Sequence, residues 1–361
     1  MNCPKCGSEN PEHARYCSFC GSALNGSPRS SDHPKVRTDD LARASAVLAV
    51  LSLCTFGITA VPAIILGIVS LVRIERSGGR LAGAGLAKVA IAVPALALAL
   101  VLIFKPVTRL RDFARRGICQ NKLSGMQFTL LIYSNDYDDA LPRAAGPNSV
   151  WGPTPDWKAT SISDAYGLGD GANGQASMSA SLYLMLKYGY VTPHGYICPA
   201  DRGVTEFKAL EYGESSLLIY LWDFGPDPAR HVSYSYHMPY GPYALTTSGD
   251  PGMAVAAGRN PWQRSPAAKA RDFKAFDPNG TRAQVKAGNT MPHKFEGQNV
   301  LFLDGHVAFE KTALCGTNGD NIYTSWSGTD IRRGTPPKLG DQPRDRLDSL
   351  LVNDPPKSDD K

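Results

Sequence analysis

The chain is organised around one apolar run, LAGAGLAKVAIAVPALALALVLIF, which extends from Leu81 to Phe104. Lys88 is the only charged residue in this run. A helix needs about 20 apolar residues to cross the hydrocarbon core of a bilayer, and a lysine near one end can extend its ammonium group to the interface. The run therefore predicts a membrane-spanning helix over residues 81–104.

A second apolar segment, residues 44–72, precedes this run and carries no charge. As a single helix it would be about 43 Å long, whereas the hydrocarbon core is about 30 Å thick. Gly57 and Pro62 lie near its middle. We therefore expect either one strongly tilted helix or two half-helices that enter the membrane and return. The two segments together predict a helical membrane domain over residues 43–105, with the lipid bilayer as its partner.

Apolar periodicity continues beyond the second segment and predicts that its helix extends out of the membrane. The spacings are mainly three to five residues, which is typical of one helix face. The residues are Val107, Leu110, Phe113, Ile118, Leu123, Met126, Leu130, Tyr133 and Tyr137. Pro142 ends the helix, because proline lacks the backbone N–H that a helix interior needs. The remainder, as far as residue 332, is rich in glycine, proline and β-favouring runs, so residues 106–332 are expected to form an α+β domain.

Four of the eight cysteines lie in the first twenty residues, in two CxxCG motifs formed by Cys3, Cys6, Cys17 and Cys20. Four thiolates are the ligands of a closed, structural zinc site. About 24 residues cannot bury a core, so the metal must supply the free energy of folding. We predict a zinc ribbon over residues 1–24, with two disulfides as the alternative. The polar residues 25–42 are expected to form a flexible linker.

Composition and motifs exclude several classes of function. The net charge is +5, from 38 basic and 33 acidic residues, and this weak and dispersed excess does not indicate a nucleic-acid partner. The sequence contains no GxSxG, HExxH or P-loop motif. We therefore expect a non-enzymatic protein. The proline-rich and polar residues 333–361 predict a disordered tail, with one helical turn over residues 346–352.

Several motifs of the C-terminal part resemble the bacterial type II secretion pseudopilin-like family, whose hallmark is a C-terminal His–x–Asp-Gly region. They lie in the segments 114–123, 133–142, 196–201, 233–236, 289–307 and 320–324. The apolar segments with the basic turn between them resemble a small uncharacterised bacterial membrane domain that often follows zinc ribbons. The chain departs from the pseudopilin-like pattern because residues 81–104 hold no acidic residue and no prepilin cleavage site.

The resemblance implies a pilin-like domain, with a long N-terminal helix packed on an antiparallel sheet. It implies a structural or interaction role in envelope or secretion assemblies, with other pilin-like or secretion proteins or further copies of the chain as partners. A transmembrane sensor that couples the zinc ribbon to an external binding domain is the alternative, and an envelope hydrolase is a third. The expected location is the bacterial inner membrane, with the N-terminus cytoplasmic and the large C-terminal domain extracytoplasmic, because zinc thiolates are safest in a reducing compartment.

Two site hypotheses follow for the hallmark region. Asp304 and Gly305 separate two β-favouring runs, which predicts a hairpin turn because both residues accept a positive φ. The alternative is a metal site formed by His293, Asp304 and His306. A calcium site with contributions from the acidic loops 136–139 and 223–227 is also conceivable, although no EF-hand spacing occurs.

A disulfide between Cys119 and Cys198 is the expectation for the external domain. The helix of a pilin-type domain lies across its sheet, which would bring the two residues together. Closing this loop of about 80 residues would contribute about 4 kcal/mol in the chain-entropy account. The alternatives are two buried free thiols, or Cys315 as a competing partner.

Overall fold

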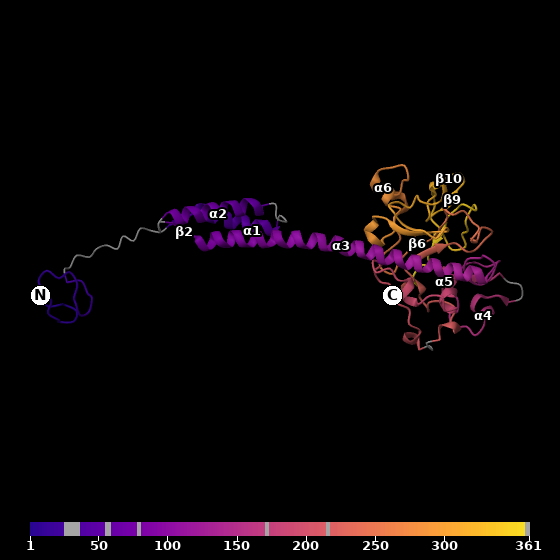
Figure 1. Cartoon of the computed structure of the whole chain (residues 1–361), viewed down its shortest axis with the longest axis horizontal. Coiled ribbons are helices and arrows are strands. Elements are labelled where there is room, and N and C mark those ends of the chain that lie inside the picture. Colours follow the sequence, from indigo (N-terminus) through magenta and orange to yellow (C-terminus); the bar gives the residue numbers. More distant parts are fainter. Residues whose placement is uncertain (25–36, 55–58, 78–80, 170–172, 214–216, 358–361) are drawn as a thin grey trace. The chain divides into compact units, whose positions relative to one another are not determined.

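The computed structural model describes residues 1–24, 37–54, 59–77, 81–169, 173–213 and 217–357. It divides into two compact units, Met1–Val107 and Thr108–Lys361. The elements are mixed helices and strands with an antiparallel sheet, so the predicted α+β class is confirmed (Figure 1). Of the predicted linker 25–42, residues 25–36 lie outside the described residues, and helix α1 already begins at Asp40.

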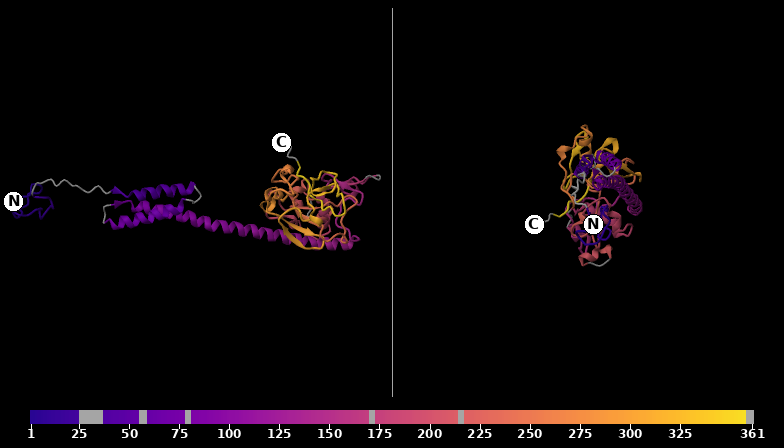
Figure 2. Two further views of the ribbon diagram at one scale, coloured as in Figure 1. Left: turned by 90° about the horizontal axis from the view of Figure 1, so that it is seen from above. Right: turned by 90° about the vertical axis from the view of Figure 1, so that its left-hand side faces the viewer.

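The first unit contains helices α1 (Asp40–Cys54), α2 (Ala60–Arg76) and the beginning of α3 (Ala84–Asp136). The predicted segment 44–72 is thus divided between two helices, and α1 and α2 pack against each other (Figure 2). Pro62 lies in the first turn of α2, where its missing N–H breaks no helical hydrogen bond. Two short strands, β1 (Arg37–Thr38) and β2 (Leu81–Ala82), pair in parallel beside the helices.

Small residues fill the interior of this helical unit. Ala49, Ala63 and Ala90, one from each helix, form its buried cluster. At Gly67 a Cβ atom would lie 2.7 Å from the Cγ1 atom of Ile91, so α2 and α3 approach closely. Large apolar side chains are instead exposed, among them Val47, Val50, Val61, Ile65, Ile68, Val89 and Leu96. A water-soluble helical bundle usually buries its large apolar side chains, whereas this unit buries small residues and exposes large apolar ones.

Within the described residues, no helix combines the length and apolar character that a membrane crossing requires. The spans predicted over 44–72 and 81–104 are therefore not found. The predicted continuation of the second segment is present, because α3 is a single helix of 53 residues.

Within the second unit, α3 has two apolar faces where the sequence predicts one. Cys119, Leu123, Met126, Leu130 and Tyr133 are buried in the core. The remaining members of the predicted face in this unit are exposed, namely Leu110, Phe113, Ile118 and, just beyond α3, Tyr137. Val107, the last residue of the first unit, is exposed as well. The prediction of a single apolar face was wrong. Residues placed three to five positions apart do not all fall on one side of a helix with 3.6 residues per turn.

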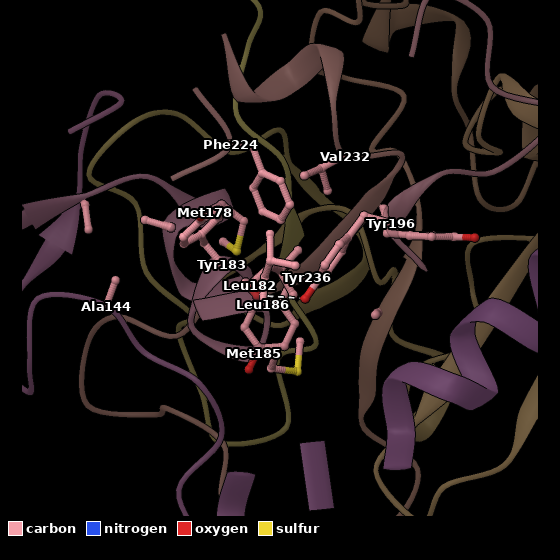
Figure 3. Packing of buried hydrophobic residues seen from close by; sticks show 14 of the residues in the cluster. Ala144, Met178, Leu182, Tyr183, Met185, Leu186, Tyr196, Phe224, Val232 and Tyr236 are labelled. Atoms are coloured by element: carbon pink, nitrogen blue, oxygen red, sulfur yellow. Dashed lines mark hydrogen bonds between the residues drawn. The ribbon is translucent and has the colours of Figure 1, made fainter. Parts of the chain in front are cut away.

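The second unit is built on a five-stranded antiparallel sheet with the strand order β11-β5-β6-β7-β8. Its strands are β5 (Tyr234–His237), β6 (Ala254–Gly258), β7 (Gln298–Phe302), β8 (Val307–Glu310) and β11 (Leu351–Val352). Both faces of the sheet are buried. Val255 and Leu301 belong to the core shared with α3 and with α5 (Met178–Lys187), whereas Ala257 and Val300 belong to a second cluster on Trp262 and Phe276. Figure 3 shows α5 residues packed with Tyr196, Phe224 and Tyr236.

The remaining elements are short. They are β3 (Val150–Trp151) in parallel with β4 (Gln175–Ala176), β9 (Ser325–Ser327) antiparallel with β10 (Asp330–Thr335), α4 (Ile162–Tyr166) and α6 (Arg282–Lys286). Single 3-10 turns are η2 (Pro193–Tyr196), η3 (Ala209–Tyr212), η4 (Leu218–Tyr220), η5 (Pro228–Arg230), η6 (Phe273–Ala275), η7 (Pro292–Phe295) and η8 (Thr317–Gly319).

The segment 333–357 is part of the fold, so the predicted disordered tail was wrong as far as residue 357. Strand β11 pairs with β5 and replaces the helical turn predicted over 346–352. Leu351 and Val352 are fully buried, and this apolar burial offsets the entropy of ordering a proline-rich segment. Beyond the strand, the carboxylate of Asp354 accepts hydrogen bonds from the backbone N–H groups of Met178 and Ser179 at 2.9 and 2.7 Å. A carboxylate at a helix N-terminus is favourable because it satisfies free N–H groups there.

Candidate metal-binding cysteine clusters

The first cluster consists of Cys3, Cys6, Cys17 and Cys20. Each pair is held by a tight turn, in which the N–H groups of Gly7 and Gly21 donate to the carbonyl groups of Cys3 and Cys17. Both glycines have φ near +70°, a conformation that side chains disfavour. The two knuckles bring all four sulfur atoms within 4.8 Å of one another.

The sulfur positions suit a tetrahedral zinc ion. The Sγ atoms of Cys3 and Cys20 are 3.7 Å apart, and those of Cys6 and Cys17 are 3.6 Å apart. Four thiolates at the usual zinc–sulfur distance of about 2.3 Å would be separated by about 3.8 Å. The Ser8 hydroxyl, followed by the backbone N–H of Cys20, lowers the pKa of Cys17 to about 5, so this sulfur already favours the thiolate form that metals bind.

Residues 2–24 match a zinc-ribbon domain. The predicted ribbon is thereby confirmed, and its four cysteines fit structural zinc. No curated protein and no solved structure matches the chain. The resemblances of the helical segment to a membrane domain and of the C-terminal unit to pseudopilin-like proteins therefore stay predictions.

The hallmark region forms a hairpin rather than a metal site. β7 and β8 pair in antiparallel register, with Leu301 opposite Val307 and with Asp304 and Gly305 in the turn. The Asp304 carboxylate and the His306 ring contact each other at 2.6 Å and are both exposed. Within the described residues, His293 shares no cluster of three metal-ligating groups with them. The metal site predicted from His293, Asp304 and His306 was therefore wrong.

His293 belongs instead to a second cluster, with Cys119 and Cys198. The three possible ligand atoms lie within 4.8 Å of one another, and all three residues are buried. The Sγ atom of Cys198 is 3.6 Å from the Nε2 atom of His293. Both cysteines are free thiols in the structure, so the predicted disulfide between them is not formed. The structure does bring the two predicted partners together, on α3 and on the turn after η2.

The surroundings of the second cluster are polar. The Tyr234 hydroxyl donates to the Sγ atom of Cys119 at 3.5 Å, and the Lys122 ammonium group donates to the Ile197 carbonyl oxygen at 2.7 Å. A hydrogen bond from the Cys198 thiol lowers the pKa of Cys119, and the same contact raises the pKa of Cys198.

This cluster is only partly predictable from the sequence. The predicted disulfide names Cys119 and Cys198, which do lie close together, whereas the predicted metal site groups His293 with Asp304 and His306, its neighbours in the chain. Three consecutive residues at His293 have φ near +60°, a rare conformation for residues other than glycine. This turn directs the histidine toward the cysteines. The spacing of residues in the sequence does not predict such a turn.

The acidic loops proposed for calcium serve other purposes. Asp223 is fully buried and accepts hydrogen bonds from the hydroxyl groups of Ser177 and Ser179 at 2.5 and 3.0 Å. Asp136 accepts a hydrogen bond from the Tyr190 hydroxyl at 2.6 Å. Within the described residues, neither loop contributes to a cluster of three or more metal-ligating groups. The calcium hypothesis therefore has no support.

Proposed function

We propose that this protein is a membrane-attached, non-enzymatic structural protein of the pseudopilin-like type, which assembles with further copies of itself through helix α3. The observation that carries this proposal is the outer face of α3 in the second unit. We define this outer face by its large apolar residues Leu110, Phe113, Ile118, Phe128, Leu131 and Ile132. All six are exposed, and Phe113 retains 76% of its accessible surface.

The outer face has the composition of a helix-packing surface. Ala114 and Gly117 lie within its first group of large residues, and Gly125 lies between the two groups. A Cβ atom added at either glycine would meet nothing within 4 Å. Small residues allow the backbones of two helices to approach, and large apolar residues on either side then bury their surface. Exposed apolar patches of this kind mark interaction sites.

A second copy of the chain is the occupant that fits best. The first members of the two groups, Leu110 and Phe128, are 18 positions apart, or about 27 Å along the helix. The α3 helix of another copy presents the same two groups at the same separation, with the same small residues in and between them. An isologous pairing therefore matches large residues with large residues at both ends of the contact.

Membrane attachment is supported by the distribution of small and large side chains in the helical unit formed by α1, α2 and the beginning of α3. Its interior consists mainly of alanine, glycine and serine, and many of its large valine, isoleucine and leucine side chains are exposed. In lipid, helices associate through small residues and expose large apolar side chains to the acyl chains. The helices α1 and α2, about 22 and 26 Å long, would enter an apolar layer and return, as in the second expectation for segment 44–72.

The assembly proposal is tested on the full chain in mild detergent, by chemical cross-linking and light scattering over a range of protein concentrations. Wild type is expected to form cross-linked dimers or larger species. Leu110→Glu and Phe128→Glu should reduce these species at least tenfold, because a carboxylate would lose its hydration in the contact. Leu210→Glu is the matched control, since Leu210 is equally exposed at 68% but lies outside α3. A wild-type protein that stays monomeric at all concentrations would contradict the proposal.

Membrane attachment is tested separately, by alkaline washing of membranes from cells that express the full chain. Wild type should stay in the membrane pellet, and Ile65→Lys should be partly released. Ile219→Lys in the second unit is the control, because Ile219 has a similar exposure of 51% against 54% for Ile65. Quantitative release of wild type would refute attachment.

A further inference from the structure

We propose that Cys119, Cys198 and His293 bind a second zinc ion inside the Thr108–Lys361 unit, independently of the zinc ribbon. The three residues come from separate segments, namely helix α3, the turn after η2 and the turn η7. Two thiolates and one imidazole are ligands of known zinc sites with three protein ligands. Nothing in the match to the zinc-ribbon domain, which covers residues 2–24, extends to this site.

The distances between the ligand atoms support zinc. A sulfur and a nitrogen ligand bound to one tetrahedral zinc ion would lie about 3.6 Å apart. The Cys198 Sγ and His293 Nε2 atoms are 3.6 Å apart. All three ligand atoms meet the same separation of 4.8 Å that the four ribbon cysteines meet. The separations between the four ribbon sulfur atoms therefore serve as a reference for the separations between the ligand atoms of the second cluster.

The turn at His293 is arranged for a ligand rather than for packing alone. His293, Lys294 and Phe295 have φ values of 65°, 60° and 59°, and none of them is a glycine. Such conformations are unfavourable for side chains and persist where other interactions compensate. In the structure His293 is buried and its Nε2 atom faces the Cys198 thiol. A metal bond would provide a stronger compensation than this thiol contact.

The surrounding groups suit a pair of metal-bound thiolates. The Tyr234 hydroxyl donates to Cys119 Sγ, and such hydrogen bonds from neighbouring groups stabilise and orient thiolate ligands. The Lys122 ammonium group donates to the carbonyl oxygens of His194 and Ile197, the latter directly before Cys198 in the chain. Its positive charge offsets the negative charge of the thiolates.

A tetrahedral ion needs a fourth ligand, which we assign to water. His293 also lines a cavity of about 360 Å³, together with Asp112, Arg202 and Met291. The chemical class of the ion follows from the donors, because thiolate and imidazole select zinc or monovalent copper among the available metals. We assign zinc, since the chain already takes up zinc at its ribbon.

The test measures the metal content of the purified full chain by elemental mass spectrometry, expressed as metal ions per chain. Wild type should hold two zinc ions. A ribbon variant in which Cys3, Cys6, Cys17 and Cys20 are all serine should hold one, and so should Cys198→Ser and His293→Gln. Cys315→Ser and His306→Gln are the controls and should hold two. One zinc ion in wild type, or copper in place of the second zinc, would overturn the proposal.

Cobalt substitution of the ribbon variant gives a second measurement that does not depend on zinc content. One equivalent of Co²⁺ should produce the visible absorption bands of a tetrahedral site with thiolate ligands, and His293→Gln in the same background should abolish or shift them. Tyr234→Phe keeps all three ligands and should weaken Zn²⁺ binding about tenfold, which preserves the test if the ligand variants fail to fold. A mass lower by two hydrogen atoms, with linked Cys119 and Cys198 peptides in wild type prepared from intact cells, would show a disulfide instead and refute the site.

Discussion

The Nε2 atom of His293 lies 3.6 Å from the Sγ atom of Cys198, although the two residues are 95 positions apart in the sequence. Cys119 completes the group from a third segment. This arrangement places a cluster of metal ligands in the core of the C-terminal unit, in addition to the cysteines of the zinc ribbon. The two clusters lie in different compact units, so their loss should have separable effects.

Removal of the ribbon zinc should unfold residues 1–24 alone. We expect Cys17→Ser to make this segment sensitive to protease, because so short a segment has no core to replace the metal. The thermal transition of the Thr108–Lys361 unit should shift by less than about 2 °C, since the ribbon belongs to a different compact unit. Limited proteolysis and calorimetry of the full chain measure both effects. A large shift of that transition would show that the ribbon stabilises the C-terminal unit.

The stability of the C-terminal unit should fall as the pH rises from about 4 to about 8. Burial, and then the nearby Asp354 carboxylate, raise the pKa of Asp223 to about 8. The folded chain therefore retains a proton that the unfolded chain loses near pH 4, and each pH unit between the two values costs up to about 1.4 kcal/mol. Above pH 8 both states have lost the proton and the slope from this group ends.

The matched variant for this pH dependence is Asp223→Asn, which keeps the shape of the side chain but cannot ionise. Burial raises the pKa of Asp320 and Asp348 as well. These two groups contribute equally to the pH dependence of wild type and of the variant, so they cancel in the difference. The difference between the unfolding free energies of the two proteins at pH 5 and pH 8 isolates Asp223. Asp223→Asn should become the more stable protein as the pH rises, and parallel curves would contradict the raised pKa.

The buried pair of Arg259 and Asp201 should be essential for stability. The Arg259 Nε atom donates to the Asp201 carboxylate at 2.7 Å, and both side chains are almost inaccessible to solvent. Arg259→Met leaves a buried carboxylate without its partner and should cost about 3–5 kcal/mol. Arg230→Met at the partly exposed pair with Asp227 is the control and should cost at most about 1 kcal/mol. Urea unfolding measures both, and equal losses would argue against a special role for burial.

Truncation should show that the C-terminal segment belongs to the fold. A chain that ends at Arg346 loses β11 and the Asp354 carboxylate, so β5 would present an unpaired edge. The N–H groups of Met178 and Ser179 at the start of α5 would lose their acceptor. We expect a marked loss of thermal stability and a tendency to aggregate. Removal of residues 358–361 is the control and should have no effect. An unchanged melting temperature after the longer truncation would contradict the structure of this segment.

Local patterns account for the features that the sequence predicts correctly. Two CxxCG motifs suffice for the zinc ribbon, because the ligands of each knuckle are three residues apart and the metal supplies the folding free energy. The long helix α3 follows from apolar residues at helical spacing, and the β7–β8 hairpin follows from Asp304-Gly305 between two β-favouring runs.

Non-local packing decided the features that the sequence did not determine. The burial of Leu351 and Val352 on β5 orders a segment whose composition predicts disorder. The division of α3 into a buried face and an exposed face depends on which side the sheet covers, and the periodicity of the helix alone does not specify that side. By itself the sequence thus determined the ribbon, the helix and the hairpin. The meeting of His293 with Cys119 and Cys198 was decided by the tertiary structure, because contacts between residues about 80 and 95 positions apart form only when the whole core packs.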